Sequence, residues 1–247
     1  MVKKIINLIF GIVGLKLIKT NAASSNSRAL SYISAKETIK SAKKEGLSVC
    51  DYVEKMWNQV GETQKVIDTI EKLGVFENTI STVCEIGAGT GRYMDKVIEK
   101  CNPNRYESYE TAKDWSAWLQ NKYPIISQTT DGFSLKSTAD RSMDLIHAHG
   151  VFVYLPFFDS LRYFKEIDRT TAKNAYIVFD CITEDCLGKK SINKWLNSDS
   201  NFPRILPEKY IFDFFPSNKY KFVGNFFTTY GLGKSKYFVF KCINHDH

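Results

Sequence analysis

Glu85-Ile-Gly-Ala-Gly-Thr-Gly-Arg92 joins a predicted strand, Thr82–Ile86, to a predicted helix near residues 91–101. Glycine lets a backbone turn sharply and come close to a ligand. A helix that begins at such a turn directs its free N–H groups at a carboxylate or a phosphate. The segment therefore predicts a loop that binds a charged small molecule, placed between a strand and a helix.

Short apolar runs alternate with helical patterns after this loop. This β-α-β-α alternation predicts a parallel, doubly wound α/β sheet with a Rossmann-like arrangement. Two strand-like runs within 220–243, separated by a glycine-containing turn, predict an antiparallel hairpin that closes the sheet. The predicted strands are 82–86, 106–110, 125–128, 144–149 and 175–181, and the predicted helices between them are 91–101, 112–122 and 157–170.

The loop's own chemistry distinguishes between nucleotide cofactors. The dinucleotide fingerprint G-x-G-x-x-G/A fails here, because its sixth position is Arg92. Glu85, two residues before the first glycine, would repel a pyrophosphate but attract an amino group. S-adenosylmethionine (SAM) carries an ammonium, a carboxylate and a sulfonium and has no phosphate, so the loop favours SAM over NAD. An acid, Glu110, follows the last glycine at a spacing typical of ribose recognition.

Residues 85–92 resemble the first motif of class I SAM-dependent methyltransferases, E/D-x-G-x-G-x-G, and the resemblance extends over residues 50–243. It implies that Glu110 holds the ribose hydroxyls, with Glu107 as a nearby competitor. Asp144–Pro156 resembles the family's fourth-strand motif, but it departs at Val153 and Tyr154, where many relatives carry Glu-His. The cofactor-binding residues that the resemblance implies are Glu85, Gly87, Ala88, Gly89, Gly91, Arg92, Glu110, Asp131, Gly132, Phe133, His149 and Gly150, with Asp131 at the adenine amino group.

The acceptor is less well defined than the cofactor. The whole chain is similar to bacterial methyltransferases that modify sugars in surface-glycan pathways, which implies O-methylation of a sugar or a lipid-linked saccharide. N-methylation of a phospholipid or a small amine is the first alternative. A membrane-tethered protein that binds SAM without turnover is the second.

Methyl transfer to a hydroxyl needs a group that takes the proton, at the carboxyl end of a strand. The predicted catalytic residues are His149, Asp180 and Tyr154, each of which has a structural alternative in the pocket wall or at a helix start. His147 points to the same side of its strand as His149 but lies deeper, so we expect a hydrogen-bonded core histidine. Trp57 is interpreted either as a lid over the cofactor or as ordinary helix packing.

Positive charge gathers at the N-terminus. The chain has 247 residues and a net charge of +7. Residues 1–50 hold nine basic and two acidic side chains, so they account for the whole net charge. A nucleic-acid enzyme usually spreads basic residues over its binding face, so no nucleic-acid partner is expected. A basic, apolar arm fits an anionic membrane surface better.

Residues 5–15, IINLIFGIVGL, form an uncharged run flanked by lysines. As a helix this run spans about 16 Å, too short for a bilayer core of about 30 Å. Three interpretations stay open: an interfacial membrane helix, an amphipathic helix docked on the protein, and a secretory signal peptide. We expect a cytoplasmic protein, peripheral at the inner membrane face through residues 1–20.

Three regions are predicted along the chain: an arm and linker over 1–28, a helical cap over 29–78 and a SAM-binding domain over 79–247. Helical patterns within 31–73 break at Gly46 and Gly61. None of the six cysteines forms a C-x-x-C pair, and no histidine has zinc-ligand spacing to them, so we expect free thiols in a reducing compartment and no metal.

Overall fold

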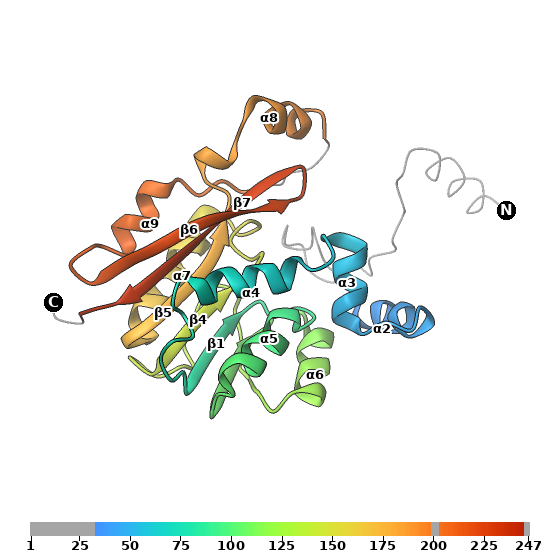
Figure 1. Cartoon of the computed structure of the whole chain (residues 1–247), viewed down its shortest axis with the longest axis horizontal. Coiled ribbons are helices and arrows are strands. Elements are labelled where there is room, and N and C mark those ends of the chain that lie inside the picture. The colour runs from blue at the N-terminus through green and yellow to red at the C-terminus, as the bar shows by residue number, and fades with distance from the viewer. Residues whose placement is uncertain (1–32, 199–202, 245–247) are drawn as a thin grey trace. The chain divides into compact units, whose positions relative to one another are not determined.

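The computed structural model describes residues 33–198 and 203–244 (Figure 1). One sheet of seven strands organises them, in the order β3-β2-β1-β4-β5-β7-β6. Strands β1 to β5 are parallel, and β7 is antiparallel to both β5 and β6. The predicted doubly wound sheet with a C-terminal antiparallel hairpin is thus confirmed. The strands are β1 (Thr82–Ile86), β2 (Arg105–Tyr109), β3 (Ile126–Ser127), β4 (Met143–Ala148), β5 (Thr171–Cys181), β6 (Tyr220–Tyr230) and β7 (Gly233–Cys242).

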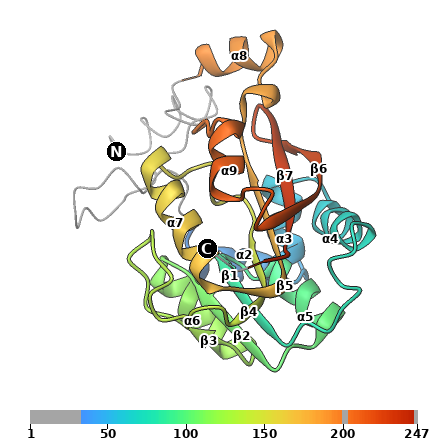
Figure 2. The same cartoon turned by 90° about the vertical axis from the view of Figure 1, so that its left-hand side faces the viewer.

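Helices cover both faces of this sheet, with α4 and α5 opposite α7 and α9 (Figure 2). The first face packs α4, α5 and α6 on residues such as Val83 and Val178. The second packs α7 and α9 around Phe179 and Phe238. The helices are α2 (Ala35–Lys44), α3 (Val49–Trp57), α4 (Glu62–Lys72), α5 (Arg92–Cys101), α6 (Lys113–Lys122), α7 (Phe157–Thr170), α8 (Lys189–Leu196) and α9 (Glu208–Phe214), with a short 3-10 turn at Glu184–Cys186.

The three helices before the sheet begin and end where local chemistry dictates. Ser34 and Ser48 cap α2 and α3 through their side-chain oxygens. Gly46 and Gly61 interrupt the helices as predicted, and both have positive φ. Helix α4 buries Val66, Ile67 and Ile70 in the same core as the sheet. The boundary between a helical cap over 29–78 and a SAM-binding domain over 79–247 stays a prediction. Helix α4, which belongs to the predicted cap, packs on the sheet.

Two segments differ from the predicted elements. Strand β5 starts at Thr171, earlier than the predicted 175, because α7 runs into it without a loop. The region 186–216, which has no regular pattern in sequence, contains α8 and α9. Both are too short for a clear helical period, and α8 has no buried residue.

The predicted arm, residues 1–28, lies outside the described residues, and so do the predicted helix over 5–15 and the predicted membrane contact of 1–20. Within residues 33–198 and 203–244, no helix has both the length and the apolarity needed to cross a membrane. All six cysteines are free thiols.

Candidate functional site

The glycine loop leaves the carboxyl end of β1 in a conformation that only glycine adopts easily. Gly87, Gly89 and Gly91 all have positive φ, between 53° and 75°. A Cβ on Gly87 would lie 2.6 Å from Val151, and a Cβ on Gly91 would lie 2.7 Å from Leu119. A Cβ on Gly89 would meet only a backbone oxygen at 4.0 Å. The middle glycine therefore faces open space, while its neighbours pack against the protein.

Glu110 closes this loop from the end of β2. One carboxylate oxygen accepts a hydrogen bond of 2.7 Å from the Gly89 N–H, and the other accepts one of 2.7 Å from Ala112. Burial raises the pKa of Glu110, and these two N–H groups act against that rise. Its competitor Glu107 is fully buried inside the sheet, with Arg105 as its ion-pair partner. Of the two acids, Glu110 is the one that reaches the glycine loop.

Glu85 lies in β1 among buried polar side chains. Its carboxyl accepts a hydrogen bond of 2.7 Å from the Tyr106 hydroxyl, and the same hydroxyl lies 2.9 Å from Nε2 of His147. Burial raises the pKa of Glu85 to about 8 and lowers the pKa of His147 to about 3. Both side chains are therefore neutral at pH 7 in the protein alone.

His149 follows the end of β4 and lies in an aromatic sandwich. Its ring stacks on Tyr93 with centroids 3.6 Å apart, and Nδ1 lies 3.1 Å from the Tyr237 hydroxyl. Burial, with smaller effects of His147 and Arg92, lowers the pKa of His149 well below its usual value. Its Nε2 is buried and has no hydrogen-bond partner. The neutral imidazole thus has one ring nitrogen that makes no hydrogen bond to the described residues.

Asp180 ends β5 next to the same loop. It accepts a hydrogen bond of 2.6 Å from the Gly150 N–H, and burial raises its pKa to about 6. Tyr154 is more exposed, and its ring meets the ring of Tyr230 edge-on at 6.0 Å. The hydroxyl of Tyr230 would lie 3.4 Å from a Cβ placed on Gly150. The three predicted catalytic residues therefore surround the Gly150 loop.

Asp131 shapes its own turn. Its carboxylate accepts hydrogen bonds from the backbone N–H groups of Phe133 and Ser134 and from the Ser134 hydroxyl. Partial burial raises the pKa of Asp131, but these hydrogen bonds outweigh it and the pKa is lowered. Gly132 lies between them with a φ of 83°. The structure thus gives Asp131 a defined structural use, and its contact with an adenine stays a prediction.

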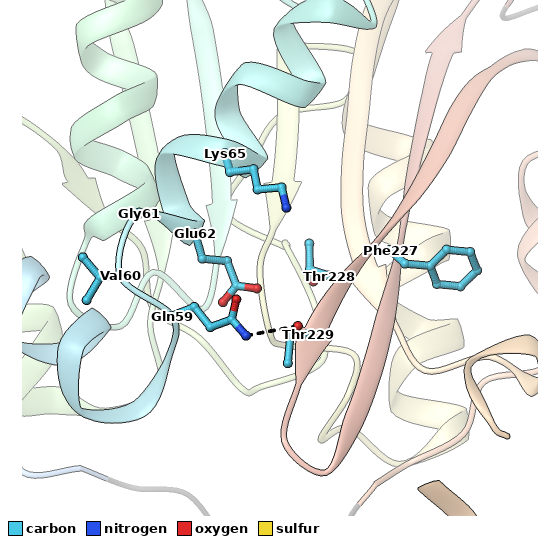
Figure 3. A pocket seen from close by; sticks show the side chains of 8 residues that line it. All are labelled: Gln59, Val60, Gly61, Glu62, Lys65, Phe227, Thr228 and Thr229. Atoms are coloured by element: carbon cyan, nitrogen blue, oxygen red, sulfur yellow. Dashed lines mark hydrogen bonds between the residues drawn. The ribbon is translucent and has the colours of Figure 1, made fainter. Parts of the chain in front are cut away.

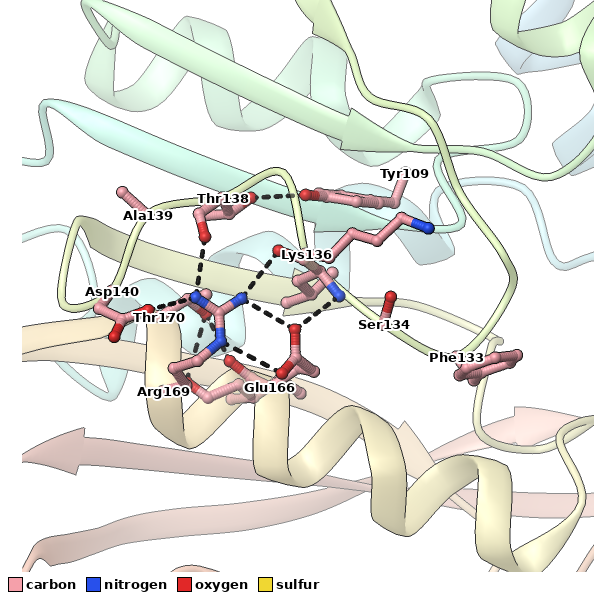
Figure 4. Close-up of polar contacts among 12 residues, drawn as sticks. Tyr109, Phe133, Ser134, Lys136, Thr138, Ala139, Asp140, Glu166, Arg169 and Thr170 are labelled. Atoms are coloured by element: carbon pink, nitrogen blue, oxygen red, sulfur yellow. Dashed lines mark hydrogen bonds and ion pairs between the residues drawn. The ribbon is translucent and has the colours of Figure 1, made fainter.

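An arginine holds the segment that follows this turn (Figure 4). Arg169, near the end of α7, donates to the carbonyl oxygens of Leu135 and Thr138, both at 2.9 Å. It also pairs with Glu166 at 2.8 Å and with Asp140. Glu166 in turn accepts a hydrogen bond of 3.0 Å from the Leu135 N–H. The loop between β3 and β4 is therefore fixed to α7.

Arg92 connects the glycine loop to the helices before the sheet. Its guanidinium donates to Thr63 at 3.4 Å and to Asn58 at 3.3 Å, and it lies over the Tyr93 ring at 4.8 Å. Trp57 is half exposed and meets Tyr52 edge-on at 5.9 Å. Its role as a lid stays a prediction.

Sequence reasoning missed three groups of this site: Tyr93, Tyr237 and the Arg169 clamp. Tyr93 directly follows the glycine motif, so its position in the first turn of the helix was the available signal. Tyr237 lies opposite Asp180 in the β5–β7 pairing. That register joins residues far apart in the chain, and no local pattern reveals it.

The residues present fit SAM. The φ values of the loop and the open space at Gly89 allow close approach of a ligand to the backbone. Glu110 keeps free lone pairs on both oxygens for ribose hydroxyls. Arg92 carries a charge that complements a carboxylate, and Glu85, neutral in the protein alone, would complement an ammonium once it is ionised. In residues 33–198 and 203–244, no three His, Cys, Asp or Glu side chains gather as a metal site.

A family model described as "Methyltransferase domain" matches residues 56–219. None of the curated proteins compared with the chain matches it. Solved structures share the fold. The N-methyltransferase NodS from Bradyrhizobium japonicum WM9, in complex with S-adenosylhomocysteine, is 14% identical with a TM-score of 0.57, and the match covers 83% of this chain and 98% of NodS.

Two further structures are similar at the level of the fold. Magnesium protoporphyrin IX methyltransferase from Synechocystis PCC 6803, with bound S-adenosylhomocysteine, is 13% identical with a TM-score of 0.57, covering 84% of this chain and 94% of that one. Geranyl diphosphate C-methyltransferase from Streptomyces coelicolor A3(2) is 9% identical with a TM-score of 0.54, covering 72% and 79%. Their acceptors differ widely, so the shared fold does not identify an acceptor.

Proposed function

The chain belongs to the family of methyltransferase domains, and we propose that it methylates a hydroxyl of a sugar or of a lipid-linked saccharide. It is a class I SAM-dependent methyltransferase. When bound, SAM supplies a methyl group already activated by its sulfonium. The protein's task is to position the acceptor, keep water out and take a proton.

We propose that the glycine loop, Arg92 and Glu110 hold the cofactor. The loop gives close backbone approach, and Glu110 presents its carboxylate from the neighbouring strand end. The Arg169 clamp keeps the β3–β4 loop in place beside them. We assign Asp131, Gly132 and Phe133 in that loop to the adenine.

The observation that carries the acceptor proposal is the unpartnered Nε2 of His149. With the hydrogen on Nδ1 donated to Tyr237, Nε2 keeps its lone pair and accepts the proton of a hydroxyl. The acceptor's O–H bond would break, its proton would go to Nε2, and its oxygen would bond to the methyl carbon. The bond between that carbon and the sulfonium would break, with S-adenosylhomocysteine as the leaving group. Asp180 fixes Gly150 beside this point and stays ionised above pH 6. An amine acceptor needs less base catalysis, so this arrangement favours a hydroxyl.

The test uses radiolabelled methyl groups on SAM with glycan and lipid extracts. His149→Ala should lower incorporation into the saccharide fraction by about a hundredfold or more, the scale of general-base catalysis. The SAM-induced melting shift should persist, because Glu110 and the glycine loop, which we assign to the cofactor, are unchanged. Lys165→Met, exposed on α7, is the control and should leave incorporation unchanged. Incorporation into an amine fraction, unchanged in His149→Ala and Asp180→Asn, would favour N-methylation. SAM binding with no transfer to any extract would favour the non-catalytic alternative.

We further propose that residues 1–20 contact an anionic membrane surface from the cytoplasmic side. The support is the lysine-flanked apolar run in the sequence. An acceptor carried on a lipid would then be presented at that surface. Co-sedimentation with phosphatidylglycerol vesicles, compared with phosphatidylcholine vesicles, tests this, and equal binding to both would contradict the electrostatic part.

A further inference from the structure

A pocket lies between the start of α4 and strand β6 (Figure 3). Segments far apart in the chain form its two walls, 59–62 with Lys65 on one side and 227–229 on the other. In Figure 3 the side chains of Glu62 and Lys65 extend toward Thr228, whereas the Phe227 ring points away. Gln59 donates a hydrogen bond of 3.4 Å to Thr229 across the gap.

The two charges of this pocket are not paired. Among the hydrogen bonds and ion pairs of residues 33–198 and 203–244, none involves the Glu62 carboxylate or the Lys65 ammonium. Lysines of the neighbouring helix α5 do find partners; Lys100, for example, pairs with Glu71 of α4 at 2.7 Å. The pocket therefore presents one negative charge, one positive charge, an amide and two hydroxyls.

The pocket is connected to the site around His149 and Asp180. The Thr228 hydroxyl lies 3.1 Å from the Ser235 hydroxyl, and Ser235 also hydrogen-bonds Asp180. On the other wall, burial raises the pKa of Tyr93, and the Asp180 and Glu62 carboxylates raise it further. Glu62 thus acts on the ring that stacks on His149. The pocket therefore neighbours the site through Thr228 and Ser235 on one wall and through Glu62 and Tyr93 on the other.

The opposite charges of Glu62 and Lys65 indicate which class of ligand fits the pocket. A phosphate would meet the repulsion of Glu62 as well as the attraction of Lys65, and a quaternary amine would meet the reverse, so neither ion is complementary to both side chains. Groups that both donate and accept hydrogen bonds satisfy all the lining residues at once. Sugar hydroxyls have this property, and neutral sugars carry no charge.

We infer that this pocket binds a neutral, hydroxyl-rich group, a sugar residue of the acceptor next to the one that is methylated. This inference rests on the proposed function and deepens it. Glu62 accepts from sugar hydroxyls, Lys65 donates to them, and Gln59, Thr228 and Thr229 complete the contacts. The pocket thereby sets which saccharide is presented to His149.

The test follows the threonine methyl signals of the full chain by NMR. The titrants are the methyl glycosides of glucose, galactose, mannose and rhamnose, with choline chloride and inorganic phosphate as charged probes. At least one sugar should shift the signals of Thr228 and Thr229 to saturation. Glu62→Gln and Lys65→Met should each weaken that binding by about tenfold, the scale of one hydrogen bond to a charged group. Lys72→Met, at the exposed end of the same helix, should leave it unchanged.

Three results would overturn the inference: no sugar shifts these signals, phosphate or choline shifts them instead, or neither pocket variant weakens the effect. A parallel titration with SAM separates this inference from the proposed function. If SAM binds all variants and no sugar does, only the pocket assignment fails. If SAM does not bind, the proposed function fails as well.

Discussion

At the residue scale, the buried pair of Glu85 and His147 shows how a charged motif residue is accommodated inside a sheet. Burial raises the pKa of Glu85 to about 8 and lowers that of His147 to about 3. Tyr106 lies between them and contacts both. Both side chains are therefore uncharged near neutral pH, so the free energy of unfolding depends on pH.

The free energy of unfolding of Glu85→Gln should rise relative to that of the native chain as pH increases from 5 to 8. The folded state keeps a proton on Glu85 that the unfolded state releases above pH 4.5. The free energy of unfolding of the native chain therefore loses this contribution as pH rises toward 8, by about 1–3 kcal/mol. Urea unfolding of both proteins at pH 5.5 and pH 8 measures the difference. If the free energy of unfolding of Glu85→Gln does not rise relative to that of the native chain between pH 5.5 and pH 8, the raised pKa of Glu85 is contradicted.

SAM binding should release a proton near pH 7. An ammonium beside Glu85 favours the carboxylate, so the pKa of Glu85 falls on binding. Calorimetric titration in phosphate and in Tris should then give different apparent enthalpies, because the two buffers take up protons with different heats. In Glu85→Gln the two enthalpies should agree. Buffer-independent enthalpies for the native chain would place the ammonium away from Glu85.

The sequence predicted the loop glycines, Glu110 and His149 as neighbours, because motif spacing and the carboxyl-end rule for parallel sheets act locally. It did not predict that Glu85 faces Tyr106 and His147. Nor did it predict Tyr237 beside His149. These contacts depend on strand register, which residues many positions apart determine together.

At the element scale, long amphipathic segments were well predicted and short ones were not. Helix α7 spans the predicted 157–170, because its apolar stripe packs on the sheet. Strand β3 has two residues where four were predicted, and it lies at the sheet edge with one neighbour. Helices α8 and α9 fall within residues 186–216, where the sequence has no regular pattern. The structure of short elements depends on tertiary packing, which a local sequence pattern does not predict.

Gly91→Ala should destabilise the protein more than Gly46→Ala by about 1–3 kcal/mol, the usual cost of an overpacked site. Both glycines have positive φ, so the backbone strain is matched. A Cβ on Gly91 lies 2.7 Å from Leu119, whereas none of the surrounding atoms comes within 4 Å of one on Gly46. Thermal unfolding of the two variants compares them. Equal losses of stability in the two variants would show that Leu119 moves aside and accommodates the added methyl group.

Arg169→Met should free the β3–β4 loop from α7. The substitution removes the donors to the carbonyl oxygens of Leu135 and Thr138. It also removes the ion-pair partner of Glu166, which keeps its hydrogen bond from the Leu135 N–H. We expect a loss of about 2–3 kcal/mol in stability and faster hydrogen exchange at residues 135–140. Lys165→Met, exposed on the same helix, is the control. Unchanged exchange in Arg169→Met would mean that other contacts hold the loop.

At the scale of the whole molecule, the described residues between 33 and 244 form one compact unit. Its two apolar cores lie on opposite faces of the sheet, and the polar site lies at the carboxyl ends of the parallel strands. The glycine loop after β1, Glu110 after β2, His149 after β4 and Asp180 at the end of β5 all meet at this edge. The doubly wound topology thus brings four chain segments to one ligand-sized region.

Calorimetric titration of the full chain with SAM, with NADH as a control, shows whether the glycine loop is a SAM site. We expect saturable binding of SAM, no binding of NADH, and a loss of SAM affinity in Glu110→Ala that Glu99→Ala, exposed on α5, does not show. If SAM does not bind, or if NADH binds in its place, the glycine loop is not a SAM site and the assignment of its residues is wrong.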